Sequence, residues 1–233
     1  MIYENIKDIE ENILKACKKA GRNRDEITLI AVSKTQTIDK IEEVLETGIL
    51  NLGENKVQEL VSKIEALNQD KHKNIKWHMI GHLQRNKVKY IVDKVALIHS
   101  VDSVRLAKQI EKEAKKCDVE VDVLIEVNIA NDPNKFGFKE DEVYSAILEI
   151  AKLKHINIKG LMTIAPYVED PEDNRVYFSK MKQLSVDIDA KNIDNVSMET
   201  LSMGMTGDYR VAIEEGATMV RIGTAIFGER NYD

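Results

Sequence analysis

The sequence predicts a (β/α)₈ barrel, the TIM-barrel fold, because short apolar segments alternate with amphipathic helical segments along the chain. The apolar segments are nearly continuous, which is typical of parallel strands that are covered by helices. Eight such strands can be assigned in 233 residues, a length that suits one α/β barrel. No Pro/Gly/Ser-rich linker divides the sequence, so we expect a single domain spanning 1–233, without a second β domain.

An amphipathic helix over 3–20 precedes the first expected strand. Its apolar residues recur at helical spacing, and Gly21 ends it. These residues are Ile2, Ile6, Ile9, Ile13, Leu14 and Cys17. Because the last expected strand has no helix after it, we expect this extra N-terminal helix to complete the outer ring.

The expected strands are short segments rich in β-branched and other apolar residues. They lie at 27–33, 49–55, 75–81, 95–102, 121–130, 156–166, 197–204 and 217–227. All but the last are followed by a segment with helical periodicity. These segments lie at 37–48, 55–67, 84–92, 103–116, 139–153, 171–189 and 207–215. Thr37 is suited to cap the helix over 37–48, and Gly48 is suited to end it.

Composition excludes several functional classes. The net charge of −6, with basic and acidic residues interspersed, argues against nucleic acid as the main partner. Cys17 and Cys117 are far apart and neither belongs to a CxxC pair, so we expect no disulfide framework and a reducing compartment. The N-terminus lacks the apolar core of a signal peptide, and no apolar run is long enough to span a bilayer. We therefore expect a cytoplasmic protein with no membrane partner.

Two glycine-containing loops follow the seventh and eighth expected strands. In this fold the loops after the strands form the functional rim, and this pair is the recurrent phosphate site. Ser202, Gly204, Gly223 and Thr224 suit such a site, because glycine lets backbone N–H groups approach an anion and hydroxyls add donors. The alternative is ordinary turn chemistry, which uses the same residue types.

The first expected strand ends in Ser33-Lys34-Thr35, although lysine tolerates burial poorly. Desolvation at a barrel mouth favours the neutral amine, which forms a Schiff base with an aldehyde. A lysine opposite a phosphate site therefore fits pyridoxal 5′-phosphate (PLP), a phosphorylated aldehyde. The alternatives are that Lys34 extends to solvent or pairs with Glu54.

Six motifs lie at the predicted rim. They are AVSKTQ (31–36), GEN (53–55), WHMIGHLQRNK (77–87), LMTIAP (161–166), LSMGMTGDY (201–209) and VRIGTAIFGER (220–230). Through these motifs the chain resembles the pyridoxal phosphate homeostasis protein family over most of its length. The resemblance implies a cytoplasmic, single-domain barrel that binds PLP, the vitamin B6 cofactor, and has no established enzymatic turnover.

The resemblance also implies roles for individual residues. Lys34 matches the lysine that holds PLP as a Schiff base, and Arg221 matches an arginine that contacts either the ring nitrogen or the phosphate. The other implied cofactor-binding residues are Asn55, Ile80, Gly81, Ser202, Met203, Gly204, Gly223 and Thr224. Thr206 departs from the serine that is more common in the family but keeps a hydroxyl. Lys135 matches a common lysine of the loop after the fifth strand and is a candidate second amine.

We interpret the chain first as a PLP-binding protein that takes part in intracellular PLP homeostasis and delivery. We expect apo PLP-dependent enzymes as its partners, and we assign no catalytic residues. An arginine at the ring nitrogen keeps the ring neutral, which weakens it as an electron sink. The rival functions are a PLP-dependent amino-acid racemase and a Schiff-base aldolase without PLP. We expect a monomer and no metal site, because His78, His82 and His99 lack a clear further ligand.

Overall fold

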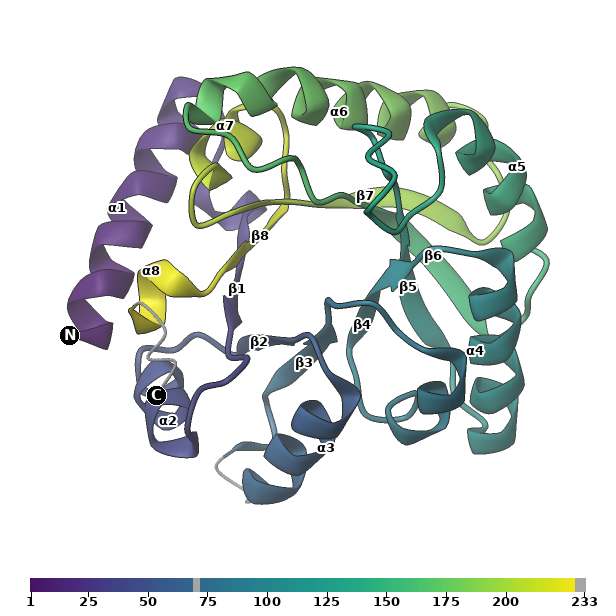
Figure 1. The fold of residues 1–233 in the computed structure, drawn as a ribbon, viewed down its shortest axis with the longest axis horizontal. Helices are drawn as coiled ribbons and strands as arrows, with labels where there is room; N and C mark the ends of the chain where they lie inside the picture. Colours follow the sequence, from purple (N-terminus) through teal and green to yellow (C-terminus); the bar gives the residue numbers. More distant parts are fainter. Residues whose placement is uncertain (69–71, 229–233) are drawn as a thin grey trace.

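The computed structural model describes residues 1–68 and 72–228. Within these residues eight parallel strands close into a barrel in sequence order, from β1 to β8 and back to β1 (Figure 1). The strands are β1 (Thr28–Val32), β2 (Asn51–Glu54), β3 (Lys76–Met79), β4 (Leu97–Val101), β5 (Val121–Glu126), β6 (Ile156–Met162), β7 (Val196–Met205) and β8 (Met219–Ile222). Pairing of Thr28 with Met219 and of Ala31 with Ile222 closes the barrel between β1 and β8. The predicted fold class is confirmed.

Helical segments surround the strands. The α-helices are α1 (Ile2–Lys19), α2 (Ile38–Glu46), α3 (Val57–Ala66), α4 (Val104–Cys117), α5 (Glu140–Ile150), α6 (Arg175–Asp189), α7 (Tyr209–Glu214) and α8 (Thr224–Phe227). The 3-10 segments are η1 (Arg24–Glu26), η3 (Arg85–Tyr90) and η4 (Pro171–Asn174). Among the described residues no helix is both long and apolar enough to cross a membrane.

Two sequence expectations about these elements are wrong. The expected helix over 84–92 is the 3-10 segment η3, in which the Lys87 N–H donates to the carbonyl of Gln84. The last strand ends at Ile222 and α8 follows it, because the N–H groups of Ile226 and Phe227 donate to the carbonyl of Gly223. A helical turn thus replaces the second half of the expected strand.

The N-terminal helix completes the outer ring. Helix α1 contacts α7, α8 and α2, and in Figure 1 α7 lies near one end of α1 while α8 lies near the other. The Asn5 side-chain amide donates to the carbonyl of Ile226 at 2.9 Å, which fixes α1 against α8. The expected position of this helix is confirmed, although it shares the position with the short α8.

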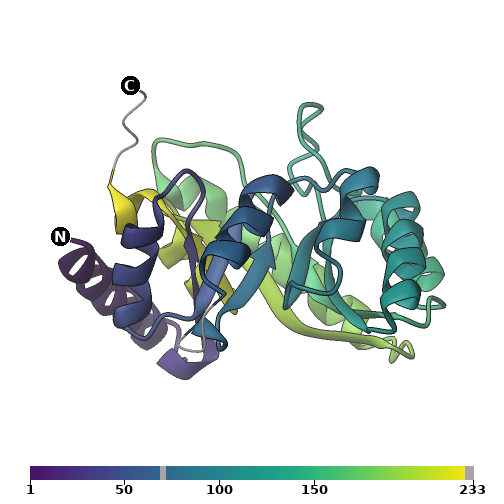
Figure 2. The same cartoon turned by 90° about the horizontal axis from the view of Figure 1, so that it is seen from below.

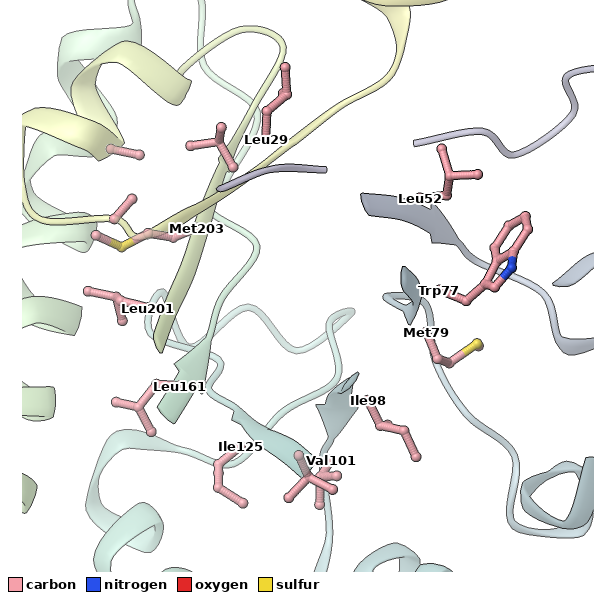
Figure 3. Close-up of a cluster of buried hydrophobic side chains, with 14 of the residues drawn as sticks. Leu29, Leu52, Trp77, Met79, Ile98, Val101, Ile125, Leu161, Leu201 and Met203 are labelled. Carbon is pink, nitrogen blue, oxygen red and sulfur yellow. The ribbon is translucent and has the colours of Figure 1, made fainter. Parts of the chain in front are cut away.

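Side chains alternate between the two faces of the barrel wall. Outward-facing strand residues form one apolar layer with the helices; Figure 3 labels Trp77, Met79, Leu201 and Met203 among them. Trp77 therefore lies in the core. The residues between them, His78 and Ser202, face the barrel interior, where a smaller apolar cluster of Leu97, Leu124, Met162 and Met219 also lies. The barrel interior is thus unusually polar for this fold, which is normally filled by branched apolar residues.

Candidate functional site

A cavity of about 570 Å³ lies at the carboxyl ends of the barrel strands. Its volume falls in the range typical of small-molecule sites. Seven of the ten residues predicted to bind the cofactor line it: Lys34, Asn55, Ile80, Gly81, Arg221, Gly223 and Thr224. These residues come from the ends of β1, β2, β3 and β8, so the barrel brings together segments that are far apart in sequence.

The other three predicted residues, Ser202, Met203 and Gly204, do not line this cavity. The Ser202 hydroxyl is buried inside the barrel, and Met203 belongs to the outer apolar layer. Gly204 has a φ of +91° and packs against α7, where an added Cβ would lie 2.6 Å from the Ala212 Cβ. The loop instead presents the next three residues, Met205, Thr206 and Gly207, to the cavity.

A tight turn carries Lys34. The Gln36 N–H donates to the carbonyl of Ser33 at 3.0 Å, so the chain reverses over Ser33–Gln36. Thr35 has a φ of +64°, a conformation that is unusual for a β-branched residue. Lys34 is half-buried at the cavity wall. The ammonium bound to Glu54 at 2.7 Å belongs to Lys63, a residue that the sequence reasoning did not consider.

The opposite wall consists of the loops after β7 and β8. The Asp208 carboxylate fixes the first loop, because its Oδ1 accepts from the Met205 N–H at 2.7 Å and its Oδ2 accepts from the Asn174 amide at 2.8 Å. Asp208 holds the N-cap position of α7 but makes no side-chain cap bond. Thr206 and Gly207 from this loop, together with Gly223 and Thr224, offer hydroxyls and accessible backbone to the cavity. Such a surface can bind an anion.

Arg221 lies at the bottom of the cavity and is almost fully buried. Its guanidinium donates to the Ser202 hydroxyl at 2.6 Å and to the carbonyl of Thr163 at 2.8 Å. Desolvation lowers the pKa of Arg221 to about 10, so the guanidinium stays charged at neutral pH. The side chain therefore presents a fixed positive charge to any bound molecule.

A chain of hydrogen bonds continues from Arg221 through the barrel interior. The Ser202 hydroxyl lies 2.9 Å from His99 Nδ1, and His99 Nε2 lies 3.0 Å from His78 Nδ1. This hydrogen-bond network ends at the side-chain oxygen of Asn51, which lies 3.0 Å from His78 Nε2. Desolvation lowers the pKa of His78 to about 4 and that of His99 well below its ordinary value. Both imidazoles are therefore neutral, and each can donate one bond and accept one.

Glu126, at the end of β5, also lines the cavity. Its side chain is buried, and its Oε2 has no hydrogen-bond partner among the described residues. Desolvation, reinforced by the nearby Asp102 carboxylate, raises the pKa of Glu126 to about 7. The sequence reasoning missed this residue. The available signal was the acid inside the apolar run VLIEV (123–127), since a buried acid in a strand needs a reason.

Comparison with known proteins gives one consistent result. The model of the alanine racemase N-terminal domain matches residues 5–231. A pyridoxal phosphate homeostasis protein of Aquifex aeolicus is 45% identical over 98% of each chain, and one of Vibrio alginolyticus is 37% identical over 99% of this chain and 98% of the other. The chain belongs to the pyridoxal phosphate homeostasis protein family.

A solved structure agrees with this membership. The structure of PipY of Synechococcus elongatus with PLP bound superposes with a TM-score of 0.85 at 27% identity, covering 98% of this chain and 100% of the other. Alanine racemases of Clostridium difficile superpose at only 16–17% identity, which shows a shared barrel and nothing further. The resemblance inferred from the motifs is thus confirmed at the level of the family.

His82 and Phe136 line the outer edge of the cavity. The rings of His82 and Phe136 stack with centroids 3.8 Å apart, and His82 Nδ1 lies 3.0 Å from the Asp102 carboxylate. The predicted second amine, Lys135, donates to the carbonyls of Ile164 and Ala165 at 3.2 and 2.9 Å. It therefore joins the loops after β5 and β6, the first of which (teal) stands above the rim in Figure 2. Among the described residues no group of three potential metal ligands occurs.

Proposed function

We propose that the chain binds PLP in the cavity at the carboxyl ends of its strands, attached covalently to Lys34. The observation that carries this proposal is that Lys34 and the loops after β7 and β8 line the same cavity from different strands. An amine on one side and an anion-binding surface on the other match the aldehyde and the phosphate of one small molecule. When bound, PLP would supply an aldehyde carbon that reacts reversibly with primary amines.

The residues present fit this cofactor. Gly207 has no atom within 4 Å of an added Cβ and leaves its backbone accessible to a phosphate. An added Cβ at Gly223 would lie 3.3 Å from Val32, so glycine there lets the loop pass close to β1. Thr206 and Thr224 would add hydroxyl donors. Arg221 lies two residues before Gly223 on the inward face of β8, below these loops, so we assign its guanidinium to the ring nitrogen. Asn55, Ile80 and Gly81 would bound the ring.

We further propose that the protein holds and delivers PLP in the cytoplasm as a monomer, with apo PLP-dependent enzymes as recipients. The membership in a family whose curated relatives are named PLP homeostasis proteins supports this role. A permanently charged Arg221 supports storage over catalysis, because a guanidinium donates to the ring nitrogen without transferring its proton. We expect no vigorous turnover.

The test is absorbance and covalent trapping. The chain mixed with PLP is expected to absorb at about 420 nm, the band of a protein-bound PLP chromophore. Borohydride reduction should then add the cofactor's mass to the peptide that contains Lys34. The Lys34→Ala variant should show neither signal, whereas Lys108→Ala, at an exposed ion pair on α4, should keep both. A colourless wild type, or a label on another lysine, would contradict the proposal.

A second candidate, weak amino-acid racemisation, is favoured by Glu126. A carboxyl with a pKa of about 7 inside the cavity has the acidity expected of a proton-transfer group. Exchange of solvent deuterium into the Cα position of amino acids would distinguish the two functions. Rapid exchange that disappears in Lys34→Ala and falls in Glu126→Gln would establish the enzyme, and its absence would support the carrier.

A further inference from the structure

The main chain on both sides of Lys34 is held by side chains from α3. The Lys63 ammonium donates to the carbonyl of Ser33 at 2.6 Å, directly before Lys34. The Glu59 carboxylate accepts from the N–H of Thr35, directly after it. The two peptide groups that flank Lys34 are thus bonded to residues four positions apart on one face of the same helix.

These two side chains belong to a buried ion cluster. The Lys63 ammonium also lies 2.7 Å from Glu54 Oε1 and 2.7 Å from Glu59 Oε1, and the Ser33 hydroxyl donates to Glu54 at 2.6 Å. All three N–H bonds of the ammonium therefore have acceptors, which fixes its position. Helix α3 packs against β2 and β3, beside the strand that carries Lys34 (Figure 1).

The turn that the cluster holds is strained. Thr35 is the third residue of the turn over Ser33–Gln36 and has a φ of +64°, where glycine or asparagine is usual. Such a conformation persists in a β-branched residue only when the surroundings hold it. Two bonds act on the strained residue itself: its N–H donates to Glu59, and its hydroxyl donates to the Lys34 carbonyl at 2.6 Å. Only the bond to Glu59 links it to another element of the fold.

We propose that Glu59 and Lys63 are positioning residues that clamp the strained turn so that Lys34 projects into the cavity. The proposal rests on the proposed function of Lys34 and adds what sets its orientation. Without the clamp the turn relaxes, Lys34 samples directions away from the cavity, and condensation with the aldehyde slows. Binding of the phosphate, on the far side of the cavity, is unaffected.

Glu59→Ala is the decisive variant. Glu59 is partly exposed, and its removal leaves the buried pair of Glu54 and Lys63 intact. We expect it to weaken PLP binding, measured by absorbance, by about tenfold or more, since misplaced reacting groups lose large factors. Binding of pyridoxine 5′-phosphate, which lacks the aldehyde, should change by less than about twofold because it needs only the anion loops. Equal losses for both ligands would contradict the proposal, since they indicate a general structural defect.

Two further variants and one control sharpen the test. Glu59→Gln keeps an oxygen for the Thr35 N–H and should retain most PLP binding. Thr35→Gly removes the strain, so Glu59→Ala should cost much less PLP binding in that background than in the wild type. The matched control is Glu113→Ala, which removes the acid of another Glu–Lys helix pair, on α4, and should change nothing. If Glu59→Ala weakens PLP binding as much in the Thr35→Gly background as in the wild type, the proposed clamp is wrong.

Amide hydrogen exchange on the unliganded chain tests the clamp without the cofactor. The Thr35 N–H should be protected in the wild type and should exchange much faster in Glu59→Ala. If PLP fails to attach to the wild type but this difference is observed, the proposed function fails while the clamp stands as a structural feature. If PLP attaches normally and the exchange rates are equal, the clamp is wrong and the proposed function stands.

Discussion

The two walls of the cavity are built in different ways. On the β1–β2 side, charged side chains support the site: Lys63 and Glu59 bond to the backbone around Lys34, and Glu54 completes the cluster. On the β7–β8 side, backbone conformation supports it: Gly204 turns at a φ of +91°, Gly207 leaves open backbone, and Gly223 packs closely against Val32 of β1. The difference follows from the two tasks, because an amine must be aimed in one direction whereas an anion is bound by several converging N–H groups.

The same contrast occurs between two buried acids. Glu54 ends β2 and Glu126 ends β5, and both are at least nine-tenths buried. Burial raises the pKa of both carboxyls, but at Glu54 the Lys63 ammonium at 2.7 Å and the Ser33 hydroxyl oppose the rise. Glu126 has no ion pair among the described residues, and its pKa rises to about 7. An acid with a buried cation serves as a support, and an acid without one remains available for titration.

The largest expected effect tests the backbone-built wall. Gly204→Ala should lower the free energy of unfolding by about 3–5 kcal/mol, because a Cβ at this positive φ is strained and would lie 2.9 Å from the Tyr209 Cα. Gly207→Ala, in the same loop but with nothing within 4 Å of its Cβ, should change it by less than about 1 kcal/mol. Denaturant unfolding measures both, and equal effects would show that the loop is not held by close packing at Gly204.

The next effect concerns Glu126, the acid without a cation partner among the described residues. Because folding raises the Glu126 pKa from 4.5 to about 7, Glu126 contributes stability that is complete below pH 4.5 and is lost as pH rises through 7. Between pH 5 and 8 the wild type should therefore lose about 2–3 kcal/mol relative to Glu126→Gln. Unfolding curves of both proteins across this range give the difference directly. A constant difference would mean that Glu126 is ionised throughout.

The smallest effect concerns two hydroxyls of the LSMGMTGDY motif. Thr206 lines the cavity and Ser202 bonds to Arg221 and His99, so only Thr206 can reach a phosphate directly. Thr206→Val should weaken pyridoxine 5′-phosphate binding by about tenfold, the value of one hydrogen bond to a charged group. Ser202→Ala should weaken it less. If Ser202→Ala instead weakens binding more than Thr206→Val, then Ser202 is the phosphate contact, as the sequence predicted.

The sequence was informative where a local pattern decides the structure. Nearly continuous apolar strands predicted the barrel, and the strand ends predicted that Lys34 and Gly223 share a rim. It was uninformative where the pairing register between strands determines which side chains face the cavity. The pairing of β7 with β8 shifts between Ser202 and Met205, and beyond this irregularity Thr206, not Gly204, lines the cavity. No residue pattern marks such a shift in advance.

The sequence likewise did not show which side chains from different elements form ion pairs. Glu54 was expected to be a possible partner of Lys34, but Lys63, one helix later, binds Glu54. Glu59 and Lys63 read as an ordinary exposed pair on a helix, because their spacing does not reveal that β2 supplies a second carboxylate beneath them. The role of α3 therefore became visible only with the three-dimensional structure.

The most direct measurement of the two-walled site is a crystal structure of the chain grown with PLP. The account predicts density continuous with the Lys34 amine, the ring above Arg221, and the phosphate against Thr206, Gly207 and Gly223. A cofactor bound with its phosphate toward β1–β3, or attached to a lysine outside the cavity, would contradict it.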